Sequence, residues 1–152
     1  MIIPFVDHAD GSLLPPADME QLSRFGGASR AAQWAAWRRA VYAETGASAI
    51  SYAETGAPLL IEPKKWKHIG VSHTDNVAAV IFSNLPGAVD IEDPARDFSR
   101  ARSRFLSRLE EELPASGDPR FPAAIWCANE TRYKLSGRRG IDLLRALHIV
   151  SG

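Results

Sequence analysis

The pattern of apolar and polar positions in the first half of the chain predicts one long helix and several short strands. Residues 28–44 are rich in alanine. Within them Trp34, Trp37 and Val41 lie three or four positions apart, which places them on one helix face. Gly46 is expected to end this helix. Short apolar runs bounded by turn residues predict strands at 2–6, 48–52, 59–61, 68–72, 77–82 and 88–92.

From Pro94 onward the pattern changes to that of charged amphipathic helices. We expect helices at 98–113 and 123–135, and a further short helix after Gly140. Strands followed by helices are typical of an α+β fold. A chain of 152 residues without a clear linker is most economically one domain.

Composition excludes several classes of protein. The 18 basic and 18 acidic residues cancel, so no overall field favours nucleic acid or an anionic membrane. A local basic groove formed by the arginines at 100, 102, 104 and 108 is still compatible with this balance. Cys127 is the single cysteine, which excludes an internal disulfide and a cysteine-rich zinc site. The start lacks the basic region of a signal peptide, and the apolar runs are too short to span a membrane, so we expect a soluble cytoplasmic protein.

The acidic stretch "AVDIE" at 88–92 is the first candidate for chemistry. Strand alternation puts Asp90 and Glu92 on the same side, with side chains about 7 Å apart. A divalent cation can bridge carboxylates at this spacing. The alternative is an edge strand with a solvated acidic face, which the spacing alone favours.

A second candidate is "WCANETRYK" at 126–134. Glu130 could supply a third carboxylate, and Lys134, one helical turn later, could neutralise a phosphate. On spacing alone a surface ion pair is the commoner explanation. Ser72 and His73 end a predicted strand, where they could bind a phosphate or be ordinary loop residues.

Four short motifs follow one another with a characteristic spacing. They are "GAP" at 56–58, "VSHT" at 71–74, "AVDIE" at 88–92 and "WCANETRYK" at 126–134. In this order the chain resembles the 4′-phosphopantetheinyl transferases, specifically their two-lobed, surfactin-synthetase-type branch. The family's signatures are a "GKP"-like turn, an "SHS"-like turn, a "G(V/I)DIE" strand and a helix "W-x-x-K-E-x-x-x-K". The resemblance covers roughly residues 20–140 and implies that fold, with a first lobe over about 1–86 and a partial second lobe over about 87–152.

The resemblance implies a magnesium-dependent transfer of the phosphopantetheine arm of coenzyme A to a serine of an acyl or peptidyl carrier protein. Asp90, Glu92 and Glu130 match the family's magnesium ligands, and Asp90, Glu130 and Lys134 its catalytic residues. Glu130 also matches the residue proposed to help deprotonate the acceptor serine, and Lys134 a lysine that contacts phosphate.

Other positions match residues that hold coenzyme A. Ser72 and His73 match the turn around the nucleotide 3′-phosphate, and either Arg38 or Arg39 matches an arginine near that phosphate. Asn129 stands where the family has a lysine directed at coenzyme A, so we expect Asn129→Lys to tighten binding.

The chain departs from the family at Ala57, which replaces the lysine of the "GKP" turn, and after Gly152, where the family continues into strands that complete the second lobe. Lys64, Lys65 and Lys67 are nearby substitutes for the turn lysine. An incomplete second lobe would favour self-association. Three functions stay open: an active transferase, a family member that binds coenzyme A or a carrier protein without turnover, and a non-enzymatic scaffold.

Two structural expectations follow from these assignments. Glu130 is expected close to Asp90 and Glu92, because a metal site requires the three carboxylates to converge. Trp126 is expected to be buried against the sheet, and with Cys127 to have a structural role in anchoring the helix that presents Glu130.

Overall fold

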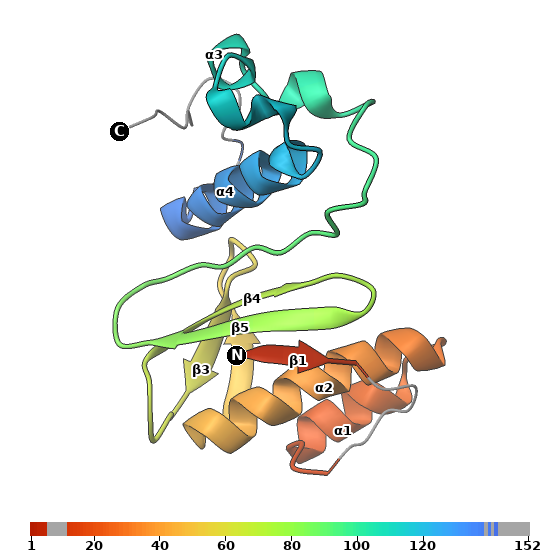
Figure 1. Ribbon diagram of the computed structural model, residues 1–152. Coiled ribbons are helices and arrows are strands. Elements are labelled where there is room, and N and C mark those ends of the chain that lie inside the picture. Colours follow the sequence, from red (N-terminus) through yellow and green to blue (C-terminus); the bar gives the residue numbers. More distant parts are fainter. Residues whose placement is uncertain (6–11, 139, 141, 143–152) are drawn as a thin grey trace.

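The structure, a computed structural model, describes residues 1–5, 12–138, 140 and 142. It is a mixed α+β structure with small antiparallel sheets (Figure 1). The larger sheet has the strand order β1-β5-β4, and the smaller one pairs β2 with β3. The strands are β1 (Ile2–Pro4), β2 (Ala49–Tyr52), β3 (Pro58–Ile61), β4 (His68–His73) and β5 (Val77–Ser83). The helices are α1 (Pro16–Ser23), α2 (Ala28–Thr45), α3 (Arg108–Glu111) and α4 (Phe121–Ser136), with 3-10 turns η1 (Arg102–Arg104) and η2 (Pro114–Gly117).

Most elements of the first half agree with the sequence pattern. The helix predicted at 28–44 is confirmed as α2, which ends where Gly46 adopts a φ of 62°. Glycine takes this left-handed conformation without the steric cost of a side chain. The strands predicted between residues 2 and 82 are confirmed with bounds shifted by one or two residues. In the described part of the chain, no helix is long and apolar enough to cross a membrane.

Two predictions for the second half are wrong. The helix expected at 98–113 does not form, because residues 98–106 contain only turns and η1, and the short α3 begins after Ser107. The Ser107 hydroxyl accepts from the Glu110 amide, while the Glu110 carboxylate accepts from the Ser107 amide, which is a capping box. The segment 88–92, expected to be a strand, pairs with no strand of either sheet. The short helix expected after Gly140 lies outside the described residues.

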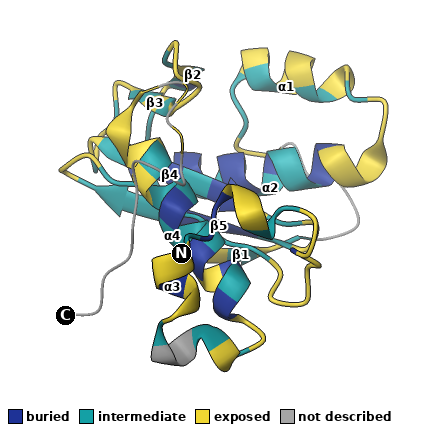
Figure 2. Cartoon of the chain, turned by 90° about the horizontal axis from the view of Figure 1, so that it is seen from above, coloured by how far each residue is buried: buried dark blue, intermediate teal, exposed yellow. Residues whose placement is uncertain are grey.

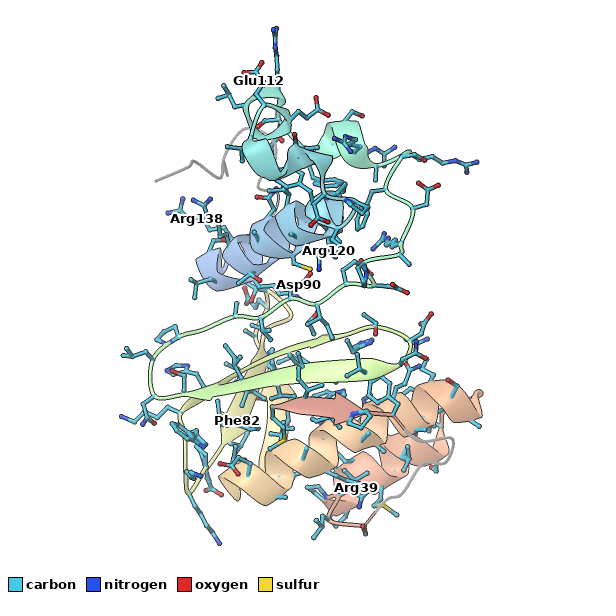
Figure 3. All side chains as sticks on the ribbon, in the orientation of Figure 1. Arg39, Phe82, Asp90, Glu112, Arg120 and Arg138 are labelled. Carbon is cyan, nitrogen blue, oxygen red and sulfur yellow. The ribbon has the colours of Figure 1, made fainter. Side chains whose placement is uncertain are left out.

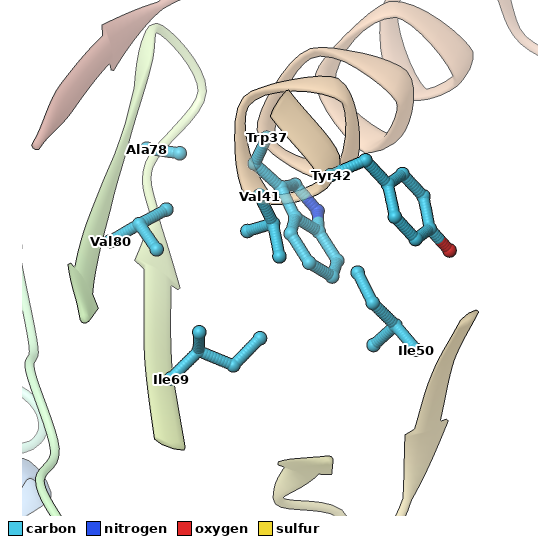
Figure 4. Close-up of a cluster of buried hydrophobic side chains, with 7 residues drawn as sticks. All are labelled: Trp37, Val41, Tyr42, Ile50, Ile69, Ala78 and Val80. Carbon is cyan, nitrogen blue, oxygen red and sulfur yellow. The ribbon is translucent and has the colours of Figure 1, made fainter. Parts of the chain in front are cut away.

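The first hydrophobic core lies between α2 and the strands (Figure 4). The small buried alanines let α2 approach the sheet closely, so that Trp37 and Val41 reach the core. Buried residues recur along α2, whereas α1 is largely exposed (Figure 2). Helix α1 contributes no buried residue. The core consists of Trp37, Val41, Tyr42, Ile50, Ile69, Ala78 and Val80.

Strand β4 presents different side chains to its two faces. Ile69 and Val71 pack against the first core, and alternation directs Gly70 and Ser72 to the opposite face. The segment 87–92 crosses that face between the sheet and α4 (Figure 1). It approaches so closely that a Cβ atom on Gly70 would lie 3.1 Å from the Cα atom of Ala88.

Gly70→Ala should therefore lower the free energy of unfolding by about 1–3 kcal/mol, because the added methyl group overpacks a backbone contact. The matched control is Gly26→Ala, where an added Cβ meets no atom within 4 Å. Urea denaturation of the two variants measures the difference. Equal stability would mean that the segment 87–92 does not rest on Gly70.

A second hydrophobic cluster lies beyond this segment. Trp126 of α4 contacts Phe105 at 5.1 Å and Phe98 at 6.0 Å between ring centroids. Trp126 is thus half-buried in the second cluster, which corrects the expectation that it packs against the sheet. Helix α4 is fixed to the cluster by this contact, and further along the helix Lys134 bonds to Val89 and Asp90 of the segment 87–92. The buried members are Phe98, Phe105, Leu106, Phe121, Ala123 and Ile125.

Candidate functional site

Asp90 is held from two sides. The Ser72 hydroxyl, on β4, donates to Oδ1 of Asp90 at 2.8 Å, and the amide of Ile91 donates to that hydroxyl at 3.3 Å. From α4, Nζ of Lys134 donates to the same Oδ1 at 2.5 Å and to the carbonyl oxygen of Val89 at 3.2 Å. The Asp90 side chain is only 8% exposed. The segment 87–92 is therefore clamped by side chains rather than by a strand ladder.

One face of α4 carries the groups that meet Asp90. Cys127, Glu130 and Lys134 are three and four residues apart, so they share this face. Burial raises the pKa of Glu130, the Asp90 charge raises it further, and Lys134 opposes both. Burial raises the pKa of the Cys127 thiol to about 12, with Asp90 and then Glu92 adding to the effect. Glu130 and Asp90 thus lie close enough to interact electrostatically, and Lys134 bonds to Asp90 while lining a pocket with Glu130.

Glu92, the third predicted metal ligand, is engaged elsewhere. Its carboxylate pairs with Arg96 and also accepts from the Asp93 amide at 3.0 Å. The Arg96 guanidinium lies 5.1 Å from the Phe98 ring centroid and 5.4 Å from that of Trp126. Among the described residues, no group of three or more His, Cys, Asp or Glu side chains is arranged to hold a metal ion.

The raised pKa of Glu130 predicts how stability depends on pH. The folded protein binds the Glu130 proton more readily than the unfolded chain, so this group's contribution to stability is lost as pH rises above the ordinary carboxyl pKa of about 4.3. Glu130→Gln removes that dependence. The unfolding free energy of Glu130→Gln relative to the wild type should increase from pH 4 to pH 7.

Denaturant titrations at several pH values test this expectation. The control is Glu20→Gln on α1, whose carboxylate is 67% exposed and pairs with Arg24 one turn away. Its stability relative to the wild type should change much less with pH. A constant difference for Glu130→Gln across the range would contradict the placement of Glu130 beside Asp90.

The structure places Arg38 away from this site. Its guanidinium is buried and lies 4.2 Å from the Trp34 ring centroid and 4.8 Å from that of Trp37. It donates to Asp18 at 3.0 Å and to the Tyr52 hydroxyl at 2.8 Å. Arg38 therefore joins α1, α2 and β2, and the phosphate contact expected for it has no support here.

Neither Arg39 nor His73 is among the side chains that clamp Asp90. Arg39 donates to the carbonyl oxygen of Ser12 at 3.1 Å, and Figure 3 shows it across the sheet from Asp90. His73 follows Ser72 in β4, so alternation turns it to the other face, where it is exposed and packs edge-on against Phe5 at 6.5 Å. His73 lines a second, open pocket of about 790 Å³ together with Glu92 and Arg96.

Asn129 does not face the acidic residues. Its side chain is fully buried, and its amide donates to the carbonyl oxygen of Phe105 at 3.1 Å. It lies four residues after Ile125, on the face of α4 that packs into the second cluster. The prediction that Asn129 contacts a phosphate is therefore wrong, because this residue anchors α4 to the second cluster.

A pocket of about 300 Å³ adjoins the acidic pair. The β2–β3 turn contributes Gly56 and Ala57 to its wall. The "GAP" motif therefore lines the same pocket as α4, which carries "WCANETRYK". Helix α4 and the residues after it contribute Glu130, Lys134 and Arg138. Sequence reasoning missed Arg138, which follows the end of α4 at Gly137 and so lies outside the helical spacing of this face.

A scan against protein-family models and a search of curated proteins found no match to this chain. The candidate site rests on its own geometry. It combines a half-buried carboxyl group of raised pKa, a clamped carboxylate and two cationic side chains at a pocket. Such a set can attract a phosphate, place a hard cation among oxygen atoms and accept a proton.

Proposed function

We propose that this chain transfers the phosphopantetheine arm of coenzyme A to a serine of an acyl or peptidyl carrier protein, with magnesium as cofactor. The observation that carries the proposal is the clamp on Asp90 by Ser72 and Lys134. It unites three of the four family motifs, and the fourth lines the adjoining pocket. The proposal includes the family's two-lobed fold type and a cytoplasmic location.

The oxygen atoms around Lys134 suit magnesium. Asp90 and the Val89 carbonyl direct oxygens at a single cationic atom, and Glu130 adds a second carboxylate nearby. Magnesium is commonly held by one or two carboxylates, with water and substrate phosphates completing its shell. Asp90 and Glu130 fit this pattern, and Glu92 joins them only if it leaves Arg96. When bound, the metal would offset negative charge on the diphosphate.

The side chains then have distinct roles. Lys134 and Arg138 supply positive charge at the pocket for the diphosphate of coenzyme A. The serine oxygen forms a bond to the phosphorus of the pantetheine side, and the bond from that phosphorus to the bridging oxygen breaks. Glu130 accepts the serine proton, a role for which its raised pKa is suited. Adenosine 3′,5′-bisphosphate leaves.

Two observations support a second function, the binding of coenzyme A without turnover. The pairing of Glu92 with Arg96 and the buried position of Asn129 remove a carboxylate and a phosphate contact that the family provides. A protein that binds coenzyme A without turnover would tolerate both departures.

A thermal-shift assay with coenzyme A, with and without magnesium, separates these functions. An increase in Tm that requires magnesium supports the transferase, whereas an increase that is independent of magnesium supports binding without turnover. The absence of any shift would favour a scaffold and would contradict both proposals.

A further inference from the structure

We propose that Lys134 acts as an internal counter-ion that occupies the cation position beside Asp90 in the free protein. A divalent metal alone must displace this ammonium group and therefore binds weakly. A ligand that carries phosphate groups attracts the lysine and frees the position, so ligand and metal bind together. This last step rests on the proposed function, whereas the counter-ion role rests on the contacts of Lys134 alone.

The contacts of Nζ carry the first step. It bonds to Oδ1 of Asp90 at 2.5 Å and to the Val89 carbonyl oxygen at 3.2 Å. The Asp90 side chain is 8% exposed and that of Lys134 34%, so the carboxylate is largely removed from water and the lysine replaces its lost hydration. A metal ion at about 2.1 Å from the same oxygen atom would occupy the place of the ammonium group.

The surroundings allow the lysine to leave without disordering the carboxylate. The Ser72 hydroxyl also bonds to Oδ1 of Asp90, so the carboxylate stays oriented when Nζ departs. Lys134 has a flexible four-carbon stem and lines the 300 Å³ pocket, where a phosphate would lie. Arg96 balances Glu92, which leaves Asp90 and Glu130 as the acidic pair whose charge Lys134 offsets.

The direct test is the affinity for Mn²⁺ alone, measured from the electron paramagnetic resonance signal of the free ion. Lys134→Gln should bind Mn²⁺ at least about tenfold more tightly than the wild type, because a positive charge is removed at contact distance. Lys134→Arg keeps the charge and should bind as weakly as the wild type. The control Arg30→Gln removes an exposed cation from α2 and should stay within about twofold.

Unchanged or weaker binding by Lys134→Gln would overturn the inference. If Lys134→Gln fails to fold, the unaltered protein still provides a test through the NMR signal of the Lys134 ammonium group. Saturating Mg²⁺ should shift or broaden this signal, and an unchanged signal would overturn the inference.

The outcomes separate this inference from the proposed function. Tighter Mn²⁺ binding by Lys134→Gln without any binding of coenzyme A would support the counter-ion and contradict the transferase. Magnesium-dependent binding of coenzyme A, together with equal Mn²⁺ affinities for the wild type and Lys134→Gln, would support the transferase and contradict the counter-ion.

Discussion

Glu130→Gln should lower the rate of phosphopantetheine transfer by about 10²- to 10⁴-fold, the usual effect of losing a general base. Glutamine has nearly the same shape but cannot accept the serine proton. Glu130 also interacts with Asp90 and lines the pocket in which the proposal places the metal and the substrate. The rate is best measured in a single turnover with saturating coenzyme A and magnesium, so that weaker binding does not enter.

The matched control for the rate is Glu20→Gln, which removes an exposed carboxylate from α1. This variant should react at the wild-type rate. A rate for Glu130→Gln within a few-fold of the wild type would mean that another group accepts the proton, and would remove Glu130 from the proposed chemistry.

Phe105→Ala should lower the free energy of unfolding by about 3–5 kcal/mol, because a large side chain leaves a cavity in a packed cluster. Phe105 is 0% exposed and packs edge-on against Trp126 at 5.1 Å and Phe98 at 5.5 Å. Its carbonyl oxygen also accepts the hydrogen bond from Asn129. Trp126→Ala should fall at the lower end of this range, because Trp126 is only half-buried.

Urea denaturation measures this loss, and Leu109→Ala is the control because Leu109 is 66% exposed. The control should change stability by less than about 0.5 kcal/mol. A loss for Phe105→Ala no larger than that for Leu109→Ala would mean that the second cluster does not hold α4. The placement of Glu130 and Lys134 would then lose its support.

The first half of the fold could be predicted because its signals are local. The spacing of Trp37 and Val41 defines the buried face of α2, on which the partly buried Trp34 is less enclosed, and Gly46 marks the end of the helix. In the second half, side-chain hydrogen bonds override the helix predicted from the spacing of apolar residues. Ser107 caps a new helix inside a stretch whose apolar spacing suggests a continuous one.

The acidic segment illustrates a different limit. Alternation in "AVDIE" predicts a strand, but the segment is held by Ser72 and Lys134, which lie far from Asp90 in the sequence. No local pattern reports such partners. The meeting of Asp90 and Glu130 was expected from the order of the motifs, whereas the pairing of Glu92 with Arg96 was not.

The contacts of Asn129 and Arg38 differ in how far the sequence could predict them. Asn129 lies four residues after the buried Ile125, so helical spacing alone could have assigned it to the core face. Arg38 could not be placed in this way. Its partners Asp18 and Tyr52 lie on other elements, and only the folded chain brings them to α2.

Mass spectrometry of an apo carrier protein tests the central claim most directly. The carrier protein is incubated with this protein, coenzyme A and magnesium, and the reaction is repeated with Glu130→Gln. The proposal predicts that the wild type adds one phosphopantetheine group to the carrier serine and that Glu130→Gln does so far more slowly. A carrier protein of unchanged mass, with no change in the Tm of this protein on adding coenzyme A and magnesium, would contradict it.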